Sequence, residues 1–276
     1  MSVSAIKTQL EQLGLTPNKA LGQNFLCDEA AAARIGREAC LAGLPVVEIG
    51  PGLGALTGVL VAHAAQVTAV EIDGAMVRAL NLAFPHEPGL TVLHQDFLKC
   101  NLAGLFAPPG SAFTVAGNLP YYVTTPIIMR LLTSGLPIPK MVFMVQREAA
   151  RRFFAAPHAK IYGPLTVLSS VYYHAESLMS LSPASYYPQP EVDSEVVILT
   201  RREETGLCSA LPRLLDAAFA MRRKTLVNNL KATGLPAETV CALLDRCGID
   251  SRARAEELEP GRFLLLARSM EQVLAD

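Results

Sequence analysis

The residues best suited to chemistry follow residues 112–117, a short apolar segment that we predict as a strand. They are Asn118, Leu119, Pro120 and Tyr121. A side-chain amide oxygen beside a backbone carbonyl can accept both hydrogens of an exocyclic amine on a nucleobase, which directs the amine lone pair at an electrophile. Proline stiffens such a turn and brings no competing N–H, and a tyrosine ring can stack on a base. The pattern predicts a site that alkylates a base amine mainly by positioning it.

A glycine-rich turn follows the predicted strand at residues 45–50. Gly50, Gly52 and Gly54 would let the backbone turn tightly and approach a ligand closely. The spacing is G-x-G-x-G rather than the G-x-G-x-x-G of dinucleotide-binding turns, which favours a ligand without a pyrophosphate. On this motif alone, a dinucleotide-dependent oxidoreductase remains the alternative.

Two acids stand at the ends of the next two predicted strands. Glu71, followed by Ile72, can accept hydrogen bonds from both hydroxyls of a ribose. Asp96 can accept from an adenine amine, and Phe97 beside it offers an apolar wall. Together with the glycine turn, these strand ends predict a site for S-adenosylmethionine, whose sulfonium methyl is a suitable electrophile for the Asn118 turn.

Short Val- and Ile-rich segments alternate with helical patterns, which indicates an α/β fold with a mostly parallel sheet. Strands are predicted at residues 45–50, 66–72, 90–94, 112–117, 141–146, 165–173 and 194–200. Helices are predicted at residues 28–40, with Asp28 as the N-cap, and at 55–63, 74–84, 211–233, 237–247, 255–258 and 260–274. Because the region after residue 205 contains helical patterns alone, we expect a domain at residues 1–205 and a helical one at 206–276.

Composition limits the class of protein. Of the 276 residues, 51% are hydrophobic and 18% are charged, so a sizeable core is expected and global disorder is excluded. The most apolar run, residues 55–70, is interrupted by His63 and Gln66, and residues 1–15 lack the apolar region of a secretory signal. The six cysteines and five histidines have no paired or metal-ligand spacing. We expect a cytoplasmic protein without a membrane span, a disulfide framework or a metal.

The net charge of −1 conceals two basic stretches. Residues 97–175 contain one acid, Glu148, and the bases Lys99, Arg130, Lys140, Arg147, Arg151, Arg152 and Lys160. Residues 217–237 contain no acid, and their bases are Arg222, Arg223, Lys224 and Lys231. Such segregation can form a basic face on a neutral protein. We predict RNA contacts for Arg147, Arg222, Arg223 and Lys224. The alternative is that the C-terminal cations solvate a helix or pair with Glu256, Glu257 and Glu259.

A set of motifs extends over nearly the whole chain. They are Leu21–Leu26, Glu48–Gly52, Asn118–Tyr121, Gln146–Glu148, Lys160–Gly163, Pro188–Ser194 and Phe219–Leu226. Together they resemble the ribosomal RNA adenine N6-dimethyltransferases, in particular the small-subunit (16S) branch linked to kasugamycin sensitivity. Lys160–Gly163 is also compatible with a structural turn, and we assign it no catalytic role.

The resemblance implies a class I (Rossmann-like) methyltransferase fold, with a seven-stranded, mostly parallel sheet and a small helical C-terminal domain that docks on rRNA. The implied reaction transfers four methyl groups from S-adenosylmethionine to the N6 amines of two adjacent adenines near the 3′ end of 16S rRNA. The product is N6,N6-dimethyladenosine at both positions. The implied partner is the 30S subunit during its biogenesis, and the enzyme is expected to be a monomer.

Individual roles also follow from the resemblance. The family's cofactor contacts correspond to Asn24, Leu26, Gly50, Glu71, Asp96 and Asn118, and residues 23–26 would form a lid over the cofactor. The family usually has a phenylalanine before its Pro-x-Pro motif, where it sandwiches the target base. Tyr186 occupies that position here and keeps an aromatic face.

Two other functions fit part of the pattern. A 23S rRNA adenine methyltransferase that confers macrolide resistance would share the cofactor site and the Asn-Pro-Tyr turn, although the Arg222–Leu226 segment favours the small-subunit enzyme. A ribosome-biogenesis or transcription factor could keep the fold and act by binding alone. The intact Asn118–Tyr121 turn and Glu71 argue against a loss of catalysis.

Overall fold

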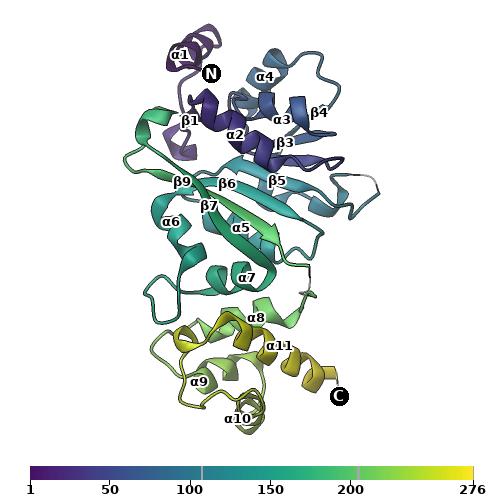
Figure 1. Cartoon of the computed structure of the whole chain (residues 1–276), viewed down its shortest axis with the longest axis vertical. Coiled ribbons are helices and arrows are strands. Elements are labelled where there is room, and N and C mark those ends of the chain that lie inside the picture. Colours follow the sequence, from purple (N-terminus) through teal and green to yellow (C-terminus); the bar gives the residue numbers. More distant parts are fainter. Residues whose placement is uncertain (107, 204–205, 276) are drawn as a thin grey trace. The chain divides into compact units, whose positions relative to one another are not determined.

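One sheet contains seven strands in the order β4-β3-β2-β5-β6-β9-β7 (Figure 1). The computed structural model describes residues 1–106, 108–203 and 206–275. The strands of this sheet are β2 (Val46–Ile49), β3 (Val67–Glu71), β4 (Leu90–His94), β5 (Thr114–Asn118), β6 (Lys140–Gln146), β7 (Tyr173–Leu181) and β9 (Ser194–Arg201). Strands β2 to β6 pair in parallel, and β9 runs antiparallel to β6. The expected α/β fold with a mostly parallel sheet is confirmed.

The first parallel strand, β2, lies at the point where the strand order reverses, with β3 on one side and β5 on the other. In open α/β sheets, ligands bind outside the carboxyl ends of the strands at such a point. All four residues of β2 are buried, because the strand is covered on both faces. This placement explains why the residues after β2, β3 and β5 can meet at one site.

Helices flank this sheet. They are α1 (Val3–Gln12), α2 (Glu29–Ala39), α3 (Thr57–His63), α4 (Gly74–Ala83), α5 (Thr124–Leu132) and α6 (Arg147–Arg151), with short 3₁₀ turns at Lys19–Leu21, Phe97–Lys99, Leu102–Gly104 and Pro183–Ser185. The predicted N-cap of α2 is confirmed, since the Asp28 carboxylate accepts from the Ala31 N–H at 2.9 Å. Ile6 and Leu10 of α1 pack in a buried cluster with Phe25, Leu53 and Met76, so the N-terminal helix is anchored beside the glycine turn.

The chain divides into two compact units. The first comprises Met1–Ala150 and Glu176–Arg201, and the second comprises Arg151–Ala175 and Arg202–Asp276. The second unit contains α7 (Pro164–Tyr172), α8 (Ala210–Ala218), α9 (Leu226–Leu230), α10 (Ala237–Arg246) and α11 (Pro260–Ala275), with 3₁₀ turns at Arg152–Phe154, Lys231–Thr233 and Ala255–Glu257. Among the described residues, no helix is long and apolar enough to cross a membrane.

The prediction of a strand at residues 165–173 is wrong. This segment is the helix α7, which begins after Gly163 with Pro164 at its first turn. Every residue of α7 except Pro164 and Ser170 is buried, and a helix that is buried on all sides has no amphipathic periodicity to distinguish it from a buried strand. The seventh strand of the sheet is instead β7, which directly follows the helix.

The prediction of one helix over residues 211–233 is also wrong. Helix α8 ends at Ala218 and α9 begins at Leu226, so residues 219–225 form a turn. Thr225 is the N-cap of α9, and its hydroxyl accepts from the Asn228 N–H at 3.4 Å. The Asn229 side chain donates to the Ala218 carbonyl at 2.6 Å, which satisfies a helix end that would otherwise lack a partner.

Candidate active site

A single pocket in the first unit brings together most of the predicted site residues. It lies at the carboxyl ends of β2, β3 and β5. The predicted residues that line it are Asn24, Leu26, Gly50, Gly52, Glu71, Ile72, Asp96, Phe97, Asn118, Leu119, Pro120 and Tyr121. Tyr186 is outside this lining set, although it was predicted to face the substrate.

The glycine turn after β2 needs glycine for two physical reasons. Gly52 has a φ of 57°, in the left-handed region that side chains with a Cβ rarely adopt. A Cβ at Gly52 would also lie 3.1 Å from the ring of Phe25. At the neighbouring strand β5, a Cβ on Gly117 would lie 2.7 Å from the Ile49 carbonyl oxygen. The backbones of the two strands therefore meet closely where the pocket opens.

Glu71 connects the glycine turn to the end of β3. One carboxylate oxygen accepts from the Gly52 N–H at 3.2 Å, and the other accepts from the Asp73 N–H at 2.9 Å. The side chain is buried, and this burial raises the pKa of the Glu71 carboxyl although the backbone hydrogen bonds lower it. Each oxygen has a further lone pair, so the carboxylate can still accept from ligand hydroxyls.

The loop that bears Asp96 adds a second acid and an apolar wall. One Asp96 carboxylate oxygen accepts from the Leu98 N–H at 2.9 Å, and Phe97 is 5% exposed. Arg130 donates to the carbonyls of Leu98 and Cys100, which holds the loop after Phe97 in place. Asp96, the predicted acceptor, and Phe97, the predicted hydrophobic surface, therefore both line the pocket.

Gln23 was expected only as part of the lid segment 23–26, and the structure shows specific contacts of its side chain. Its side-chain N–H donates to the Asp73 carboxylate at 2.8 Å, and its side-chain oxygen accepts from the Asn18 N–H at 2.8 Å. Asp73 is also the N-cap of α4. Gln23 thus fastens the segment before β1 (Phe25–Leu26) to the loop after β3. The Gln23–Leu26 motif marked this segment in the sequence. The partner of Gln23, Asp73, lies 50 residues away, so the contact could not be predicted from the motif.

Glu48 is a second residue that sequence reasoning missed. It is 2% exposed and accepts from the Thr57 hydroxyl at 2.6 Å. Burial raises the pKa of Glu48 to about 8; the hydrogen bond from Thr57 opposes this shift, and the nearby Glu71 carboxylate contributes to it. The visible signal was an acid inside an otherwise apolar strand, Val46–Ile49, next to the glycine turn. Glu48 lines the pocket.

The Asn118 side chain has a defined orientation. Its amide nitrogen donates to the backbone carbonyl of Asn24 at 2.8 Å, which leaves the amide oxygen available as an acceptor. The Leu119 N–H donates to the Met144 carbonyl at 3.0 Å, and the Thr124 hydroxyl donates to Pro120 at 3.0 Å. The turn is therefore fixed on β6 and on α5, with the Asn118 amide oxygen free to accept a hydrogen bond.

Two tyrosines lie near this turn in different environments. The Tyr121 hydroxyl is 3.5 Å from the Ser194 hydroxyl, and burial raises the pKa of the Tyr121 phenol. Tyr186 belongs to β8 (Tyr186–Tyr187) and pairs with Leu26 of β1. It is 1% exposed, and its buried hydroxyl has no hydrogen-bond partner among the described residues. Tyr121 lines the pocket, whereas Tyr186 is buried in a hydrophobic cluster that also contains Leu26.

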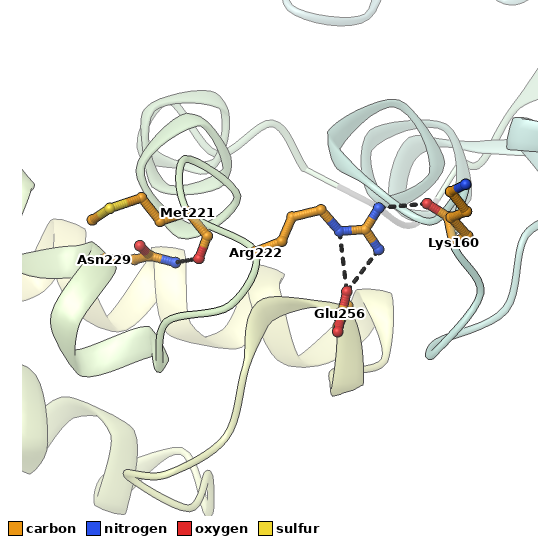
Figure 2. Close-up of polar contacts among 5 residues, drawn as sticks. All are labelled: Lys160, Met221, Arg222, Asn229 and Glu256. Carbon is orange, nitrogen blue, oxygen red and sulfur yellow. Dashed lines mark hydrogen bonds and ion pairs between the residues drawn. The ribbon is translucent and has the colours of Figure 1, made fainter.

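The four residues predicted to contact RNA differ in whether their charges are paired within the protein. Arg147 pairs with Asp193 at 2.8 Å in the first unit. In the second unit, Arg222 pairs with Glu256 at 2.6 Å (Figure 2), as the alternative for these cations anticipated. Arg223 and Lys224 are exposed, and neither has an ion pair with any residue that the structure describes. The cations of residues 222–224 lie in a turn and not on a helix face.

Metal chemistry has no visible site in this structure. Within the described ranges, no group of three or more His, Cys, Asp or Glu side chains is placed to hold a metal ion. The seven-stranded, mostly parallel sheet with a pocket at the carboxyl ends of β2, β3 and β5 is the architecture of a class I methyltransferase.

The chain matches the ribosomal RNA adenine dimethylase family over residues 14–272, and it belongs to that family. The ribosomal RNA small subunit methyltransferase A of Geobacillus thermodenitrificans is 40% identical, and the match covers 96% of this chain and 94% of that protein. The protein of the same name from Myxococcus xanthus is also 40% identical, over 95% of this chain and 93% of its own length. The resemblance inferred from the motifs is confirmed.

Solved structures agree on the fold. A dimethyladenosine transferase from Plasmodium falciparum has a TM-score of 0.74 at 23% identity, covering 90% of this chain and 98% of that one. The 23S rRNA methyltransferase ErmE has a TM-score of 0.65 at 28% identity, covering 90% of this chain and all of that one. The class I methyltransferase fold predicted from the motifs is confirmed.

Proposed function

We propose that this chain transfers methyl groups from S-adenosylmethionine to the N6 amines of two adjacent adenines near the 3′ end of 16S rRNA. The product is N6,N6-dimethyladenosine at both positions. The family assignment supports adenine dimethylation. The names of relatives that are 38–40% identical support the small ribosomal subunit as the substrate particle.

The pocket fits the proposed cofactor. When bound, S-adenosylmethionine supplies an electrophilic methyl group on a sulfonium. Glu71 would hold the ribose hydroxyls through the lone pairs that the Gly52 and Asp73 N–H groups leave unused. Asp96 would accept from the adenine amine, with Phe97 against the ring. Gly50 and Gly52 line the pocket without side chains, so the ligand could approach the backbone of the turn closely.

The observation that carries the proposal is the orientation of Asn118. Because its amide nitrogen is bound to the Asn24 carbonyl, the amide oxygen can accept one N–H of the target amine, and the Leu119 carbonyl can accept the other. Two acceptors reduce the delocalisation of the nitrogen lone pair into the ring and direct it toward the methyl group. The methylated nitrogen then loses its proton readily, so positioning is sufficient and no dedicated base is required.

The target adenine must leave its stack to reach this turn, at a cost of a few kcal/mol. Stacking on the Tyr121 ring would recover about 1–3 kcal/mol. Tyr186 corresponds to the family's base-sandwiching aromatic residue. To perform that role, its ring would have to become accessible from its present position, where it is 1% exposed.

We assign the docking of rRNA to the helical region at residues 206–276, and methyl transfer to residues 1–205. The exposed cations Arg223 and Lys224 support this assignment. Arg222 and Arg147 belong to the same proposal, although each pairs with a carboxylate. We propose that the enzyme acts in the cytoplasm as a monomer on 30S particles.

Transfer of labelled methyl groups to unmethylated 30S and 50S particles tests the substrate. The proposal expects label in the 16S rRNA of 30S particles and none in 50S particles. Label in 23S rRNA alone would indicate the macrolide-resistance activity instead. The absence of label from both particles, with cofactor bound, would favour a factor that acts by binding.

A further inference from the structure

The turn between α8 and α9, residues 219–225, presents its three cations differently. The Arg222 guanidinium makes two contacts to one carboxylate oxygen of Glu256, from Nε at 3.1 Å and from Nη2 at 2.6 Å. Its Nη1 donates to the backbone carbonyl of Lys160, as Figure 2 shows. Arg223 and Lys224 are exposed, as Arg222 is, but unlike Arg222 they have no ion-pair partner in the part of the chain that the structure describes. Arg222 is therefore held by contacts within the protein, whereas Arg223 and Lys224 have no ion pair to break before they contact a ligand.

The turn is also held from its buried side. Asn229 is 1% exposed, and its amide nitrogen donates to the Ala218 carbonyl at 2.6 Å and to the Met221 carbonyl at 3.1 Å. Figure 2 shows the bond to Met221. The Lys224 N–H donates to the same Met221 carbonyl at 2.9 Å. These contacts fix the backbone path while the Met221 side chain stays 51% exposed.

The groups that hold Arg222 are themselves tied together. The His158 N–H donates to the Glu256 carbonyl at 2.7 Å, and the Tyr162 hydroxyl donates to the Leu258 carbonyl at 2.6 Å. The segment Lys160–Gly163, to which we assigned no catalytic role, therefore joins the loop of Glu256 in supporting Arg222. Both segments belong to the second unit.

We propose that Arg222 is a positioning residue that braces the turn, and that Arg223 and Lys224 make the contacts to RNA phosphates. This inference rests on the proposed docking function. Arg222 would have to break a two-contact ion pair and a backbone hydrogen bond in order to reach a phosphate. Arg223 and Lys224 would lose no such partner. A turn that is ordered before binding also loses less conformational entropy when RNA binds.

The role of Glu256 distinguishes this proposal from direct contact by Arg222. If Arg222 bound phosphate itself, Glu256 would compete with the RNA, and its removal would strengthen binding. If Arg222 braces the turn, removal of Glu256 loosens the surface that carries Arg223 and Lys224. The two interpretations therefore predict opposite effects of Glu256→Gln on affinity.

The test measures the affinity of the full chain for unmethylated 30S particles over a series of salt concentrations. Arg223→Ala and Lys224→Ala should each reduce the slope of log affinity against log salt by roughly 0.7–0.9. Arg222→Ala should weaken binding several-fold and retain the wild-type slope, and Glu256→Gln should also weaken it. A slope for Arg222→Ala that falls as far as that of Arg223→Ala, or tighter binding by Glu256→Gln, would overturn the bracing role.

Two measurements separate this inference from the docking proposal. Arg246→Ala removes an exposed cation of α10 that donates to Gln272, and it is the matched control that should leave affinity and slope unchanged. If Arg223→Ala and Lys224→Ala also changed nothing, docking by this turn would be wrong. Hydrogen exchange at the Lys224 amide tests the brace independently of RNA. Arg222→Ala should speed that exchange at least tenfold, and an unchanged rate would contradict the brace.

Discussion

Replacing Glu48 by glutamine changes one buried carboxyl group in β2 and keeps its shape. In the wild type, burial raises the pKa of Glu48 to about 8, whereas a glutamate in an unfolded chain titrates near pH ~4.3. Between these pH values the folded state holds one proton more than the unfolded state. Stability contributed by this group is therefore fully present at low pH and is lost as the pH rises toward 8.

The loss amounts to at most about 1.4 kcal/mol per pH unit. Glutamine keeps an oxygen that can accept from the Thr57 hydroxyl, but it does not titrate. The unfolding free energy of the wild type minus that of Glu48→Gln should therefore fall between about pH 5 and 8, by a few kcal/mol in total. All other titrating groups cancel in this difference to a first approximation.

Urea unfolding of both proteins at several pH values, without cofactor, measures this difference. Glu11→Gln, at an exposed position of α1, is the matched control for the removal of one carboxylate. A Glu48→Gln difference that is independent of pH would refute the reasoning, because Glu48 would then ionise in the folded protein as readily as in the unfolded chain.

Three further predictions concern the pocket. Glu71→Ala should weaken S-adenosylmethionine binding by about 1–3 kcal/mol, the usual contribution of hydrogen bonds to a charged group, and calorimetric titration that finds unchanged affinity in the folded variant would remove Glu71 from the site. Tyr121→Ala should reduce kcat/KM for methyl transfer more than Tyr121→Phe, because stacking needs the ring; equal losses would contradict the stacking role. Tyr186→Phe removes a buried hydroxyl without a partner, so thermal unfolding should find equal or higher stability, by about 1 kcal/mol; a lower melting temperature would mean that the hydroxyl has a partner.

The pocket residues were accessible to sequence reasoning because their signals are local. Gly50 and Gly52 lie in a glycine-rich turn directly after a predicted strand, a signal that is weak alone, and Glu71 and Asp96 each end or follow a further recognisable strand. Parallel strands bring their carboxyl ends to one edge, so the convergence of these residues with Asn118 could be predicted without a structure.

The features that sequence reasoning missed depend on burial or on contacts between residues that are distant in the sequence. Residues 165–172 are buried on nearly every side without a helical hydrophobic period, and only their packing decides that they form a helix. The break after Ala218 depends on Asn229, whose amide reaches back to the end of α8. The pairing of Arg222 with Glu256 was one of several charge arrangements that the sequence allowed, and only the fold selects it.

The measurement that tests the central claim most directly is a nucleoside analysis of 16S rRNA after incubation of unmethylated 30S particles with the enzyme and S-adenosylmethionine. The account predicts two adjacent N6,N6-dimethyladenosines near the 3′ end with the wild type, and a severe loss of both with Asn118→Ala while cofactor affinity is largely retained. Full dimethylation by Asn118→Ala, or methylation at another base or atom by the wild type, would contradict the account.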